Sequence, residues 1–263
     1  LIGSATIELF DELYKNKKIK LIDVRDERTG THMADGYARA SGKAGIMIAG
    51  QNGPGVTNLV TGVAQSYKAF SPLITLAGDT ALKQTGKDSF QEIDQQKLFK
   101  PITKKTFKIN NINKLSDIIN DSLKISLSPR SGPVHVNIPR DILSKKTYYR
   151  KLKKFSKISL PSANNYKIEK VIKILIKSNK TIIIAGGGIK NNDGHKEVSN
   201  LAKILKVPII SSAGHGDVIS SDEKFYLGQM GPRGNKIATK KVYEAEVILA
   251  LGTRLGFNST FFS

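Results

Sequence analysis

One carboxylate stands at a point in the sequence where proton-transfer chemistry is plausible. Glu27 follows an apolar run at residues 19–24 and precedes an amphipathic stretch that begins near Thr31. Open α/β sheets bind ligands at the carboxyl ends of their strands, and burial there disfavours the charged form of a carboxylate. Glu27 could therefore exchange a proton with a ring nitrogen of a bound ligand. The simpler alternative is that its charge only complements the dipole of the following helix.

A glycine-rich turn follows the next apolar run. Its sequence is Gly50-Gln51-Asn52-Gly53-Pro54-Gly55-Val56-Thr57-Asn58. Glycine lets the backbone approach a ligand closely, and the N-terminus of the next helix offers free amide donors. The spacing fits neither the phosphate loop ending in Gly-Lys-Ser/Thr nor the dinucleotide fingerprint with its third glycine. The turn could hold a ligand, or it could be a tight strand-to-helix connection.

The histidines and the absence of cysteine limit the other chemistry. His32, His135, His195 and His215 lack the spacing of a metal site, so we expect no metal ligands in this sequence. Without cysteine there are no disulfides, thiolate zinc sites or cysteine nucleophiles. His32 follows Glu27 by about one and a half helical turns. It could face a ligand at Glu27 or serve the helix structurally.

Short β-branched runs alternate with longer amphipathic stretches along the whole sequence. This alternation is typical of βα units, and strands that are apolar on both faces need helices on both sides of the sheet. Helices are predicted over residues 7–13, 31–40, 56–69, 114–127, 168–176 and 198–205. Strands are predicted over residues 19–24, 46–49, 73–77, 134–138, 181–185, 207–211 and 247–251, and another should follow Lys104.

A basic stretch of low hydrophobicity divides the sequence. Residues 144–165 contain Pro161 and show no sustained period, which is typical of a linker. The prediction is one domain over residues 1–143 and a second over residues 166–263. A length of 263 residues with 39% hydrophobic composition agrees with two globular domains.

The net charge of +20 does not indicate a nucleic-acid-binding protein. The charge is mostly lysine scattered through Ile- and Asn-rich stretches, without an aromatic platform for bases, so we interpret it as solvated surface. No apolar run approaches the roughly 20 residues that cross a bilayer, and the first residues lack the features of a secretory signal. We therefore expect no nucleic-acid partner, no membrane insertion and a cytoplasmic location.

Taken in order, the acidic junction and the glycine turn resemble the pyrimidine-binding domain of thiamine-diphosphate-dependent enzymes of the acetolactate synthase type. The motifs are Glu27, Ala-Asp-Gly-Tyr-Ala-Arg at 34–39, Ser-Gly-Lys at 41–43 and Gly-Pro-Gly-Val-Thr-Asn at 53–58. Further matches follow in the family's order at Pro72 and at residues 90–92, 102–104, 132–134, 138–141, 186–188, 226–228 and 251–254. The resemblance implies an α/β fold: a doubly wound parallel-sheet pyrimidine-binding domain, then a Rossmann-like central domain that we expect to be truncated.

The resemblance also implies roles for individual residues. Glu27 matches the glutamate that hydrogen-bonds the aminopyrimidine of thiamine diphosphate, the cofactor that acts as the electron sink. The residues expected to line the pyrimidine pocket are Gln51, Gly53, Pro54, Gly55 and Asn58. The residues expected on the substrate side are Phe90, Gln91, Lys104 and His32. Lys104 could equally be a solvated lysine at the start of a strand.

Two features of the family are missing from the sequence. Gly78-Asp79 and Gly216-Asp217 are each followed by the wrong residue for the Gly-Asp-Gly segment that binds Mg²⁺. We expect Mg²⁺ and the diphosphate to be held by a third domain in a protein roughly twice this length, with a homodimer or homotetramer completing the site. After Arg254, residues 255–260 depart from the Phe-Asp-Asp of flavin-containing synthases, which argues against FAD binding.

The function implied is that of a carbon–carbon lyase or ligase that decarboxylates a 2-oxo acid and joins it to a second small carbonyl compound. Two segments favour the sulfoacetaldehyde acetyltransferase branch instead, namely residues 2–5 and Gln51-Asn52. Residues 103–104 and 140–141 favour the synthases. A third alternative is a non-catalytic scaffold or subunit paralogue, against which the intact Glu27 argues.

Overall fold

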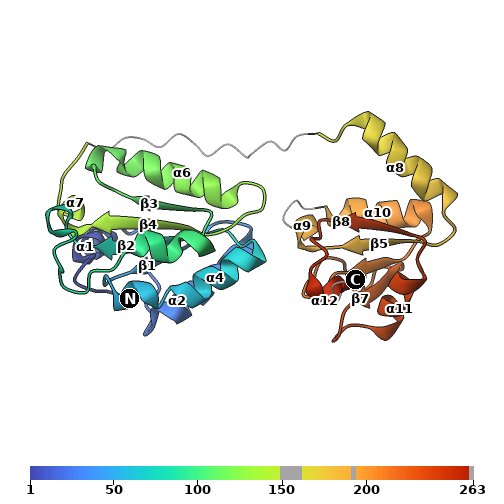
Figure 1. Cartoon of the computed structure of the whole chain (residues 1–263), viewed down its shortest axis with the longest axis horizontal. Helices are drawn as coiled ribbons and strands as arrows, with labels where there is room; N and C mark the ends of the chain where they lie inside the picture. Colours follow the sequence, from blue (N-terminus) through green and yellow to red (C-terminus); the bar gives the residue numbers. More distant parts are fainter. Residues whose placement is uncertain (149–161, 191–193, 261–263) are drawn as a thin grey trace. The chain divides into compact units, whose positions relative to one another are not determined.

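The computed structural model describes residues 1–148, 162–190 and 194–260. The chain divides into two compact units, Leu1–Leu160 and Pro161–Ser263, and each is built on its own parallel sheet (Figure 1). The predicted linker, residues 144–165, lies mostly outside the described residues, so its boundaries stay predictions. No helix among the described residues is both long and apolar enough to span a membrane.

Unit 1 contains a four-stranded sheet in the order β1-β2-β4-β3. The strands are β1 (Gly45–Ala49), β2 (Leu73–Asp79), β3 (Lys105–Lys108) and β4 (Val134–Pro139). The α-helices are α1 (Ile7–Lys15), α2 (Glu27–Ser41), α3 (Pro54–Thr57), α4 (Val60–Ala69), α5 (Gln95–Phe99), α6 (Leu115–Leu127) and α7 (Arg140–Leu143), with short 3₁₀ turns at Leu82–Gln84, Lys100–Ile102 and Ile112–Lys114. Ala49 pairs with Ala77, and Ala77 pairs with Asn137. The carboxyl ends of three strands therefore lie level at one edge of the sheet.

Helices cover both faces of this sheet, as the apolar strands predicted. Helices α2 and α4 lie on one side and α6 lies on the other (Figure 1). The first core includes Met47 and Leu59, whereas the second includes Val134 and Val136 packed against α6. Every residue of β4 is buried. This burial on both faces explains why the strand sequences are nearly continuous apolar runs.

A buried carboxylate joins α2 to α4 and accounts for part of the 34–39 motif. Asp35 is 2% exposed. Its Oδ1 accepts a hydrogen bond from Ser66 Oγ at 3.0 Å, and its Oδ2 accepts one from Arg39 Nε at 2.9 Å. Burial by itself raises the pKa of Asp35, but the hydrogen bonds from Ser71, Arg39 and Ser66 outweigh it and lower that pKa. This part of the motif therefore holds the helix pair together.

Unit 2 contains a second four-stranded parallel sheet in the order β7-β6-β5-β8. The strands are β5 (Thr181–Ala185), β6 (Ile209–Ser211), β7 (Tyr226–Gln229) and β8 (Val247–Leu251). The helices are α8 (Asn165–Lys177), α9 (Gly187–Lys190), α10 (His195–Leu205), α11 (Lys236–Glu244) and α12 (Phe257–Thr260). Both sheets thus have the parallel α/β architecture expected from the sequence.

Some predicted elements were wrong or missed. Residues 19–24 do not form a strand; Ile19, Leu21 and Ile22 are exposed, because no neighbouring strand pairs with this segment. The predicted helix 56–69 is two helices, α3 and α4, and α2 begins earlier than expected. Strand β7 and helix α11 were not predicted, since β7 is short and contains a glycine, and α11 is rich in lysine.

Candidate functional site

Glu27 is the first residue of α2 and is buried. Asp26 caps the helix, because its Oδ1 accepts a hydrogen bond from the backbone N–H of Arg28 at 2.8 Å. The cap fixes the start of the helix and with it the direction of the Glu27 side chain. Glu27 is only 5% exposed. A carboxylate is therefore held below the surface at a helix N-terminus, where the helix dipole favours negative charge.

The glycine turn runs from the end of β1 into α3. Gly53 has φ +60° and ψ −110°, a conformation that side chains disfavour, and Pro54 occupies the first turn of α3. A Cβ atom on Gly53 would lie 2.6 Å from the carbonyl oxygen of Gln91. The turn therefore requires glycine at this position, and it lies directly against the loop that carries Gln91.

The structure brings Glu27 and the glycine turn together, although the segment before Glu27 is not the strand that the sequence predicted. Asn58 Nδ2 donates a hydrogen bond to Glu27 Oε2 at 3.0 Å. A Cβ atom on Gly55 would lie 3.1 Å from Glu27 Oε1. No described residue donates a hydrogen bond to Oε1. One carboxylate oxygen is thus fixed, and the other is left available beside the open backbone of Gly55.

We call Glu27, Gly53, Gly55 and Asn58 the Glu27 cluster. Amide side chains extend this cluster toward the loop after β2. Gln51 Nε2 donates to Gln91 Oε1 at 2.7 Å, and Asn52 Nδ2 donates to the carbonyl oxygen of Phe90 at 2.8 Å. The Phe90 side chain is 77% exposed. Ser4, which the sequence did not single out as a site residue, donates to Gln51 Oε1. Its position 47 residues away in sequence gave no local signal.

Lys104, predicted on the substrate side, is not brought to this cluster. It precedes β3 and so lies at the amino ends of the parallel strands. Gln51 lies at the opposite side of the sheet, where the strands have their carboxyl ends. Its Nζ donates to Ser128 Oγ at 2.6 Å and to Ser128 O at 3.2 Å. Burial lowers the pKa of the Lys104 ammonium. Within unit 1 this lysine therefore anchors the loop after α6.

His32 lies on α2, half-buried. His32 follows Glu27 by five positions, which corresponds to about 140° around an ideal helix. The two side chains therefore leave different faces of α2. No hydrogen bond links His32 to Glu27 or the glycine turn within the described part of the chain. The structure therefore gives no support to a shared role for this pair.

A buried polar group at the ends of β2 and β4 was missed in the sequence. Asp79 Oδ2 accepts from Asn137 Nδ2 at 3.2 Å and pairs with Lys108 Nζ at 3.0 Å. Gln95 Nε2 donates to Gly78 O at 2.9 Å. The signal was present as polar residues inside two otherwise apolar strands. The contact between Gln95 and Gly78 ties together the two ends of the loop that carries Gln91.

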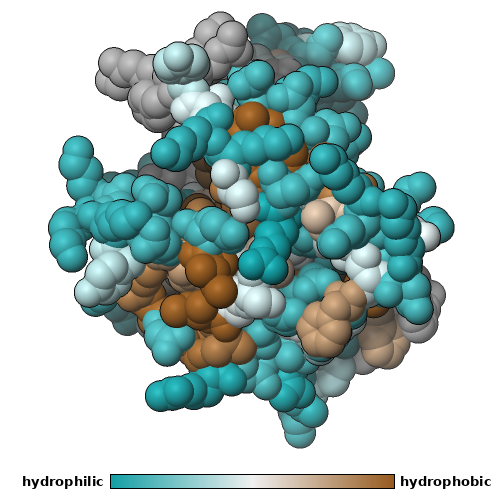
Figure 2. Space-filling model, turned by 90° about the vertical axis from the view of Figure 1, so that its left-hand side faces the viewer, coloured by the Kyte–Doolittle hydropathy of each residue, from teal (hydrophilic) through white to brown (hydrophobic). Residues whose placement is uncertain are grey.

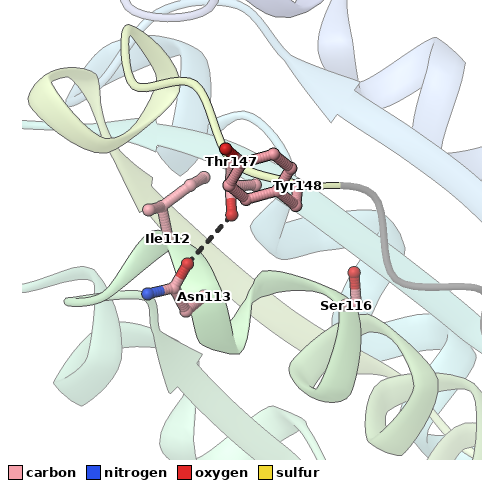
Figure 3. A pocket seen from close by; sticks show the side chains of 5 residues that line it. All are labelled: Ile112, Asn113, Ser116, Thr147 and Tyr148. Atoms are coloured by element: carbon pink, nitrogen blue, oxygen red, sulfur yellow. Dashed lines mark hydrogen bonds between the residues drawn. The ribbon is translucent and has the colours of Figure 1, made fainter.

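One surface pocket lies apart from the Glu27 cluster. It has a volume of about 290 Å³ and is lined by Ile112, Asn113, Ser116, Thr147 and Tyr148 (Figure 3). Thr147 Oγ1 donates to Asn113 Oδ1 at 2.9 Å across it. The lining holds no carboxylate, histidine or lysine. It therefore offers no strong acid or base, and we assign it no chemistry.

The surface of unit 1 is mixed in character. Ile2 is 65% exposed, and Phe90 is more exposed still. Figure 2 shows one side of the molecule, on which hydrophobic side chains gather in an area surrounded by hydrophilic ones.

Comparison with known families agrees with this geometry. Residues 1–98 match the thiamine pyrophosphate enzyme N-terminal TPP binding domain, and residues 168–262 match the thiamine pyrophosphate enzyme central domain. The chain belongs to the thiamine pyrophosphate enzymes. Its two units are consistent with the N-terminal and central domains of that family, and the Glu27 cluster lies within the N-terminal match.

Relatives of this thiamine pyrophosphate enzyme carry two different names. A probable acetolactate synthase large subunit from Methanocaldococcus jannaschii is 34% identical over 96% of this chain and 43% of its own length. The acetolactate synthase large subunit of Cyanidium caldarium is 33% identical over 96% of this chain and 45% of its own length. A sulfoacetaldehyde acetyltransferase from Alcaligenes xylosoxydans xylosoxydans is 32% identical over 97% of this chain and 42% of its own length. The chain thus spans less than half the length of these relatives.

The Glu27 cluster fits the pyrimidine end of thiamine pyrophosphate. A ring nitrogen needs a carboxylate oxygen that is not already paired, and Glu27 Oε1 meets this requirement. A flat ring needs backbone without a side chain beside the carboxylate, which Gly55 provides, whereas the Cβ position of Gly53 is filled by Gln91. Among the described residues, no group of three His, Asp or Glu side chains could hold a metal ion. The fit therefore concerns the ring and not the diphosphate.

The conformation of Gly53 can be tested by a pair of alanine substitutions. Gly53→Ala should lower the free energy of unfolding of unit 1 by about 1–3 kcal/mol, because of the positive φ and the contact with Gln91 O. Gly36 lies inside α2, and a Cβ atom at that position would meet no heavy atom within 4 Å. Gly36→Ala should raise the free energy by roughly 0.5–1 kcal/mol. Urea unfolding would measure both, and equal effects would contradict the assigned turn geometry.

Proposed function

We propose that the complete protein joins or cleaves carbon–carbon bonds of small carbonyl compounds with thiamine diphosphate, in the manner of acetolactate synthase. The observation that carries this proposal is the buried Glu27 carboxylate. One of its oxygens is fixed by Asn58, and the other is available beside the glycine turn. The similarity to acetolactate synthase large subunits supports the reaction class.

In this proposal each residue of the cluster has a distinct task. Glu27 Oε1 holds or releases a proton at the ring nitrogen, and the hydrogen bond from Asn58 keeps the carboxylate in place. Gly55 leaves room for the ring beside Glu27, and Gly53 lets the turn lie against the Gln91 loop. Gln91 and Phe90 lie on the substrate side. When bound, the cofactor supplies the electron sink for the bond-breaking step.

The remaining parts of the proposal concern groups that the described residues do not provide. Mg²⁺ and the diphosphate would be bound elsewhere in the complete protein, as a hard cation needs several oxygen ligands. A homodimer or homotetramer would complete the site, and the location would be cytoplasmic. The relatives' greater length supports the first point, since this chain spans 43% of the Methanocaldococcus jannaschii protein.

The alternative reaction is that of a sulfoacetaldehyde acetyltransferase. Residues 2–5 and Gln51-Asn52 favour it, and the similarity to a sulfoacetaldehyde acetyltransferase supports it. Purified complete protein with thiamine diphosphate and Mg²⁺ should be assayed with pyruvate and, separately, with sulfoacetaldehyde and inorganic phosphate as the acceptor of the acetyl group. Consumption of pyruvate alone supports the synthase reaction, and consumption of sulfoacetaldehyde supports the transferase. Consumption of neither would overturn the proposed function in favour of a scaffold.

Flavin should bind weakly or not at all. The glycine segment after β5, where a dinucleotide could dock, is occupied by the chain's own backbone: Gly188 N donates to Gly252 O at 2.8 Å. A Cβ atom on Gly187 would lie 2.6 Å from the ring of His215. Purified complete protein should therefore carry much less than one flavin per chain by absorbance. A stoichiometric yellow chromophore would contradict this and favour the acetolactate synthase reaction.

A further inference from the structure

We propose that Gln91 presents its side-chain NH₂ group, and not its carbonyl oxygen, to a ligand bound at the Glu27 cluster. Two backbone groups impose this orientation through Gln51 and Asn52. The ligand group that Gln91 meets must then be a hydrogen-bond acceptor, such as a carboxylate, sulfonate or carbonyl oxygen. The identification of that ligand as the substrate rests on the proposed function, but the amide orientation does not.

The first backbone group is the N–H of Ser4, which can only donate. It contacts the Gln51 amide at 3.1 Å, and Ser4 Oγ donates to the same atom at 2.7 Å. That atom must therefore be the Gln51 carbonyl oxygen, Oε1. Gln51 Nε2 then points the other way, toward Gln91 at 2.7 Å and Asn52 at 3.0 Å. Since Nε2 donates, the Gln91 atom that faces it must be Oε1.

The second backbone group is the carbonyl of Phe90, which can only accept. It lies 2.8 Å from the Asn52 amide, so the Asn52 atom there must be Nδ2. Asn52 Oδ1 is then the atom that faces Gln51 and accepts from its Nε2. The contact of Gln51 with Ser4 and that of Asn52 with Phe90 therefore require the same orientation, in which Gln51 Nε2 donates to Gln91 Oε1. Turning Gln51 around would set its NH₂ group against the Ser4 N–H and its oxygen against Asn52 Oδ1.

The position of Gln91 leaves its NH₂ group available to a ligand. Gln91 is exposed and has φ +55°, and its backbone lies against Gly53 in the turn beside Glu27. No described residue accepts a hydrogen bond from Gln91 Nε2. The amide therefore offers two N–H donors next to the cluster. Ser4, Gln51 and Asn52 are positioning residues, because they act on the ligand through Gln91.

The orientation can be tested without any cofactor. In the chain labelled with ¹⁵N-glutamine, the Gln51 NH₂ protons should exchange with solvent several-fold more slowly than those of Gln91, because only the former are hydrogen-bonded. Gln51→Met and Gln91→Met identify the two signals by their loss. Slower exchange at Gln91 than at Gln51, or equal exchange at both, would overturn the proposed orientation.

The consequence for the ligand is tested in the complete protein. Gln51→Glu can still accept from Ser4 but cannot donate to Gln91, so Gln91 must turn its NH₂ group inward and present its oxygen to the ligand. The KM for an anionic carbonyl substrate should rise roughly 10- to 100-fold, with a smaller change in kcat. Gln84→Glu adds the same charge in the exposed part of the same loop and should change KM less than threefold, about 0.6 kcal/mol.

Double substitution separates orientation from charge. If Gln51 acts through Gln91, Gln51→Glu should add little to the KM of the Gln91→Met variant, since the amide that it reorients is gone. Fully additive effects, or an unchanged KM in Gln51→Glu, would overturn the inference about the ligand. If the complete protein turns over neither carbonyl substrate, the proposed function fails, whereas the exchange measurement still decides the amide orientation.

Discussion

Replacing Glu27 with glutamine should lower the turnover of the complete protein roughly 10²- to 10⁴-fold, in the presence of thiamine diphosphate and Mg²⁺. Glutamine cannot exchange a carboxyl proton with the ring nitrogen. It has nearly the same shape, and its carbonyl oxygen can still accept the 3.0 Å hydrogen bond from Asn58. The fold should therefore persist, with an unchanged circular dichroism spectrum and an unfolding midpoint close to that of the parent.

The matched control for this substitution is Glu12→Gln. Glu12 lies on α1 with its side chain 75% exposed, and its ion pair with Lys15 is on the surface. This variant loses the same charge far from the glycine turn in sequence, so its turnover should match that of the parent. An undiminished rate in Glu27→Gln would refute the acid–base role of Glu27. A loss of folded structure in Glu27→Gln would instead show that the carboxylate is mainly structural.

Acidification should destabilise unit 1 through His135. This side chain is fully buried in the sheet, stacks on Phe99 with ring centroids 3.9 Å apart, and bonds Thr75 Oγ1 through Nδ1 at 2.8 Å. Burial lowers the pKa of His135 from 6.5 to about 3, although the neighbouring Asn137 side chain acts in the opposite direction. The folded state thus excludes a proton that the unfolded chain accepts.

The direction of the effect follows from linkage between protonation and folding. The stabilising contribution of neutral His135 is complete above pH 6.5 and is lost as the pH falls from there toward about 3. The free energy of unfolding should fall by about 2 kcal/mol between pH 6.5 and about pH 5, at roughly 1.4 kcal/mol per pH unit. His135→Gln should be less stable at neutral pH but should lack this slope. An identical slope in both proteins, measured by urea unfolding, would contradict the assignment.

The fold was largely predictable because local patterns and tertiary structure agree in most elements. The strands at residues 181–185 and 247–251 were predicted to the residue, since they are short apolar runs bounded by polar segments. The segment at residues 19–24 also contains four apolar residues, yet it forms no strand, and Val24 alone among them is buried. A strand exists only through its partner, and the pattern of one segment does not contain that information. Helix α11 was missed for the opposite reason, because its lysines obscure its apolar face.

The site was predictable where chemistry and spacing are local to a turn followed by a helix, although no strand precedes Glu27. Glu27, Gly53, Gly55 and Asn58 come together as expected. Lys104 lies away from this cluster within unit 1, because it precedes β3 and the topology places that end of the strand opposite Gln51. Its role on the substrate side stays a prediction. Ser4 and Asp79 were missed as site residues because their contacts join segments distant in the sequence.

The proposed contact between Glu27 Oε1 and the ring nitrogen of the cofactor would be visible in a crystal structure of the complete protein with thiamine diphosphate and Mg²⁺. We expect a pyrimidine nitrogen within hydrogen-bonding distance of Glu27 Oε1, roughly 2.6–3.2 Å. The backbone of Gly53 and Gly55 should lie against the ring. A cofactor ring bound away from the glycine turn, or a Glu27 carboxylate with both oxygens paired to protein groups, would refute the proposed role of Glu27.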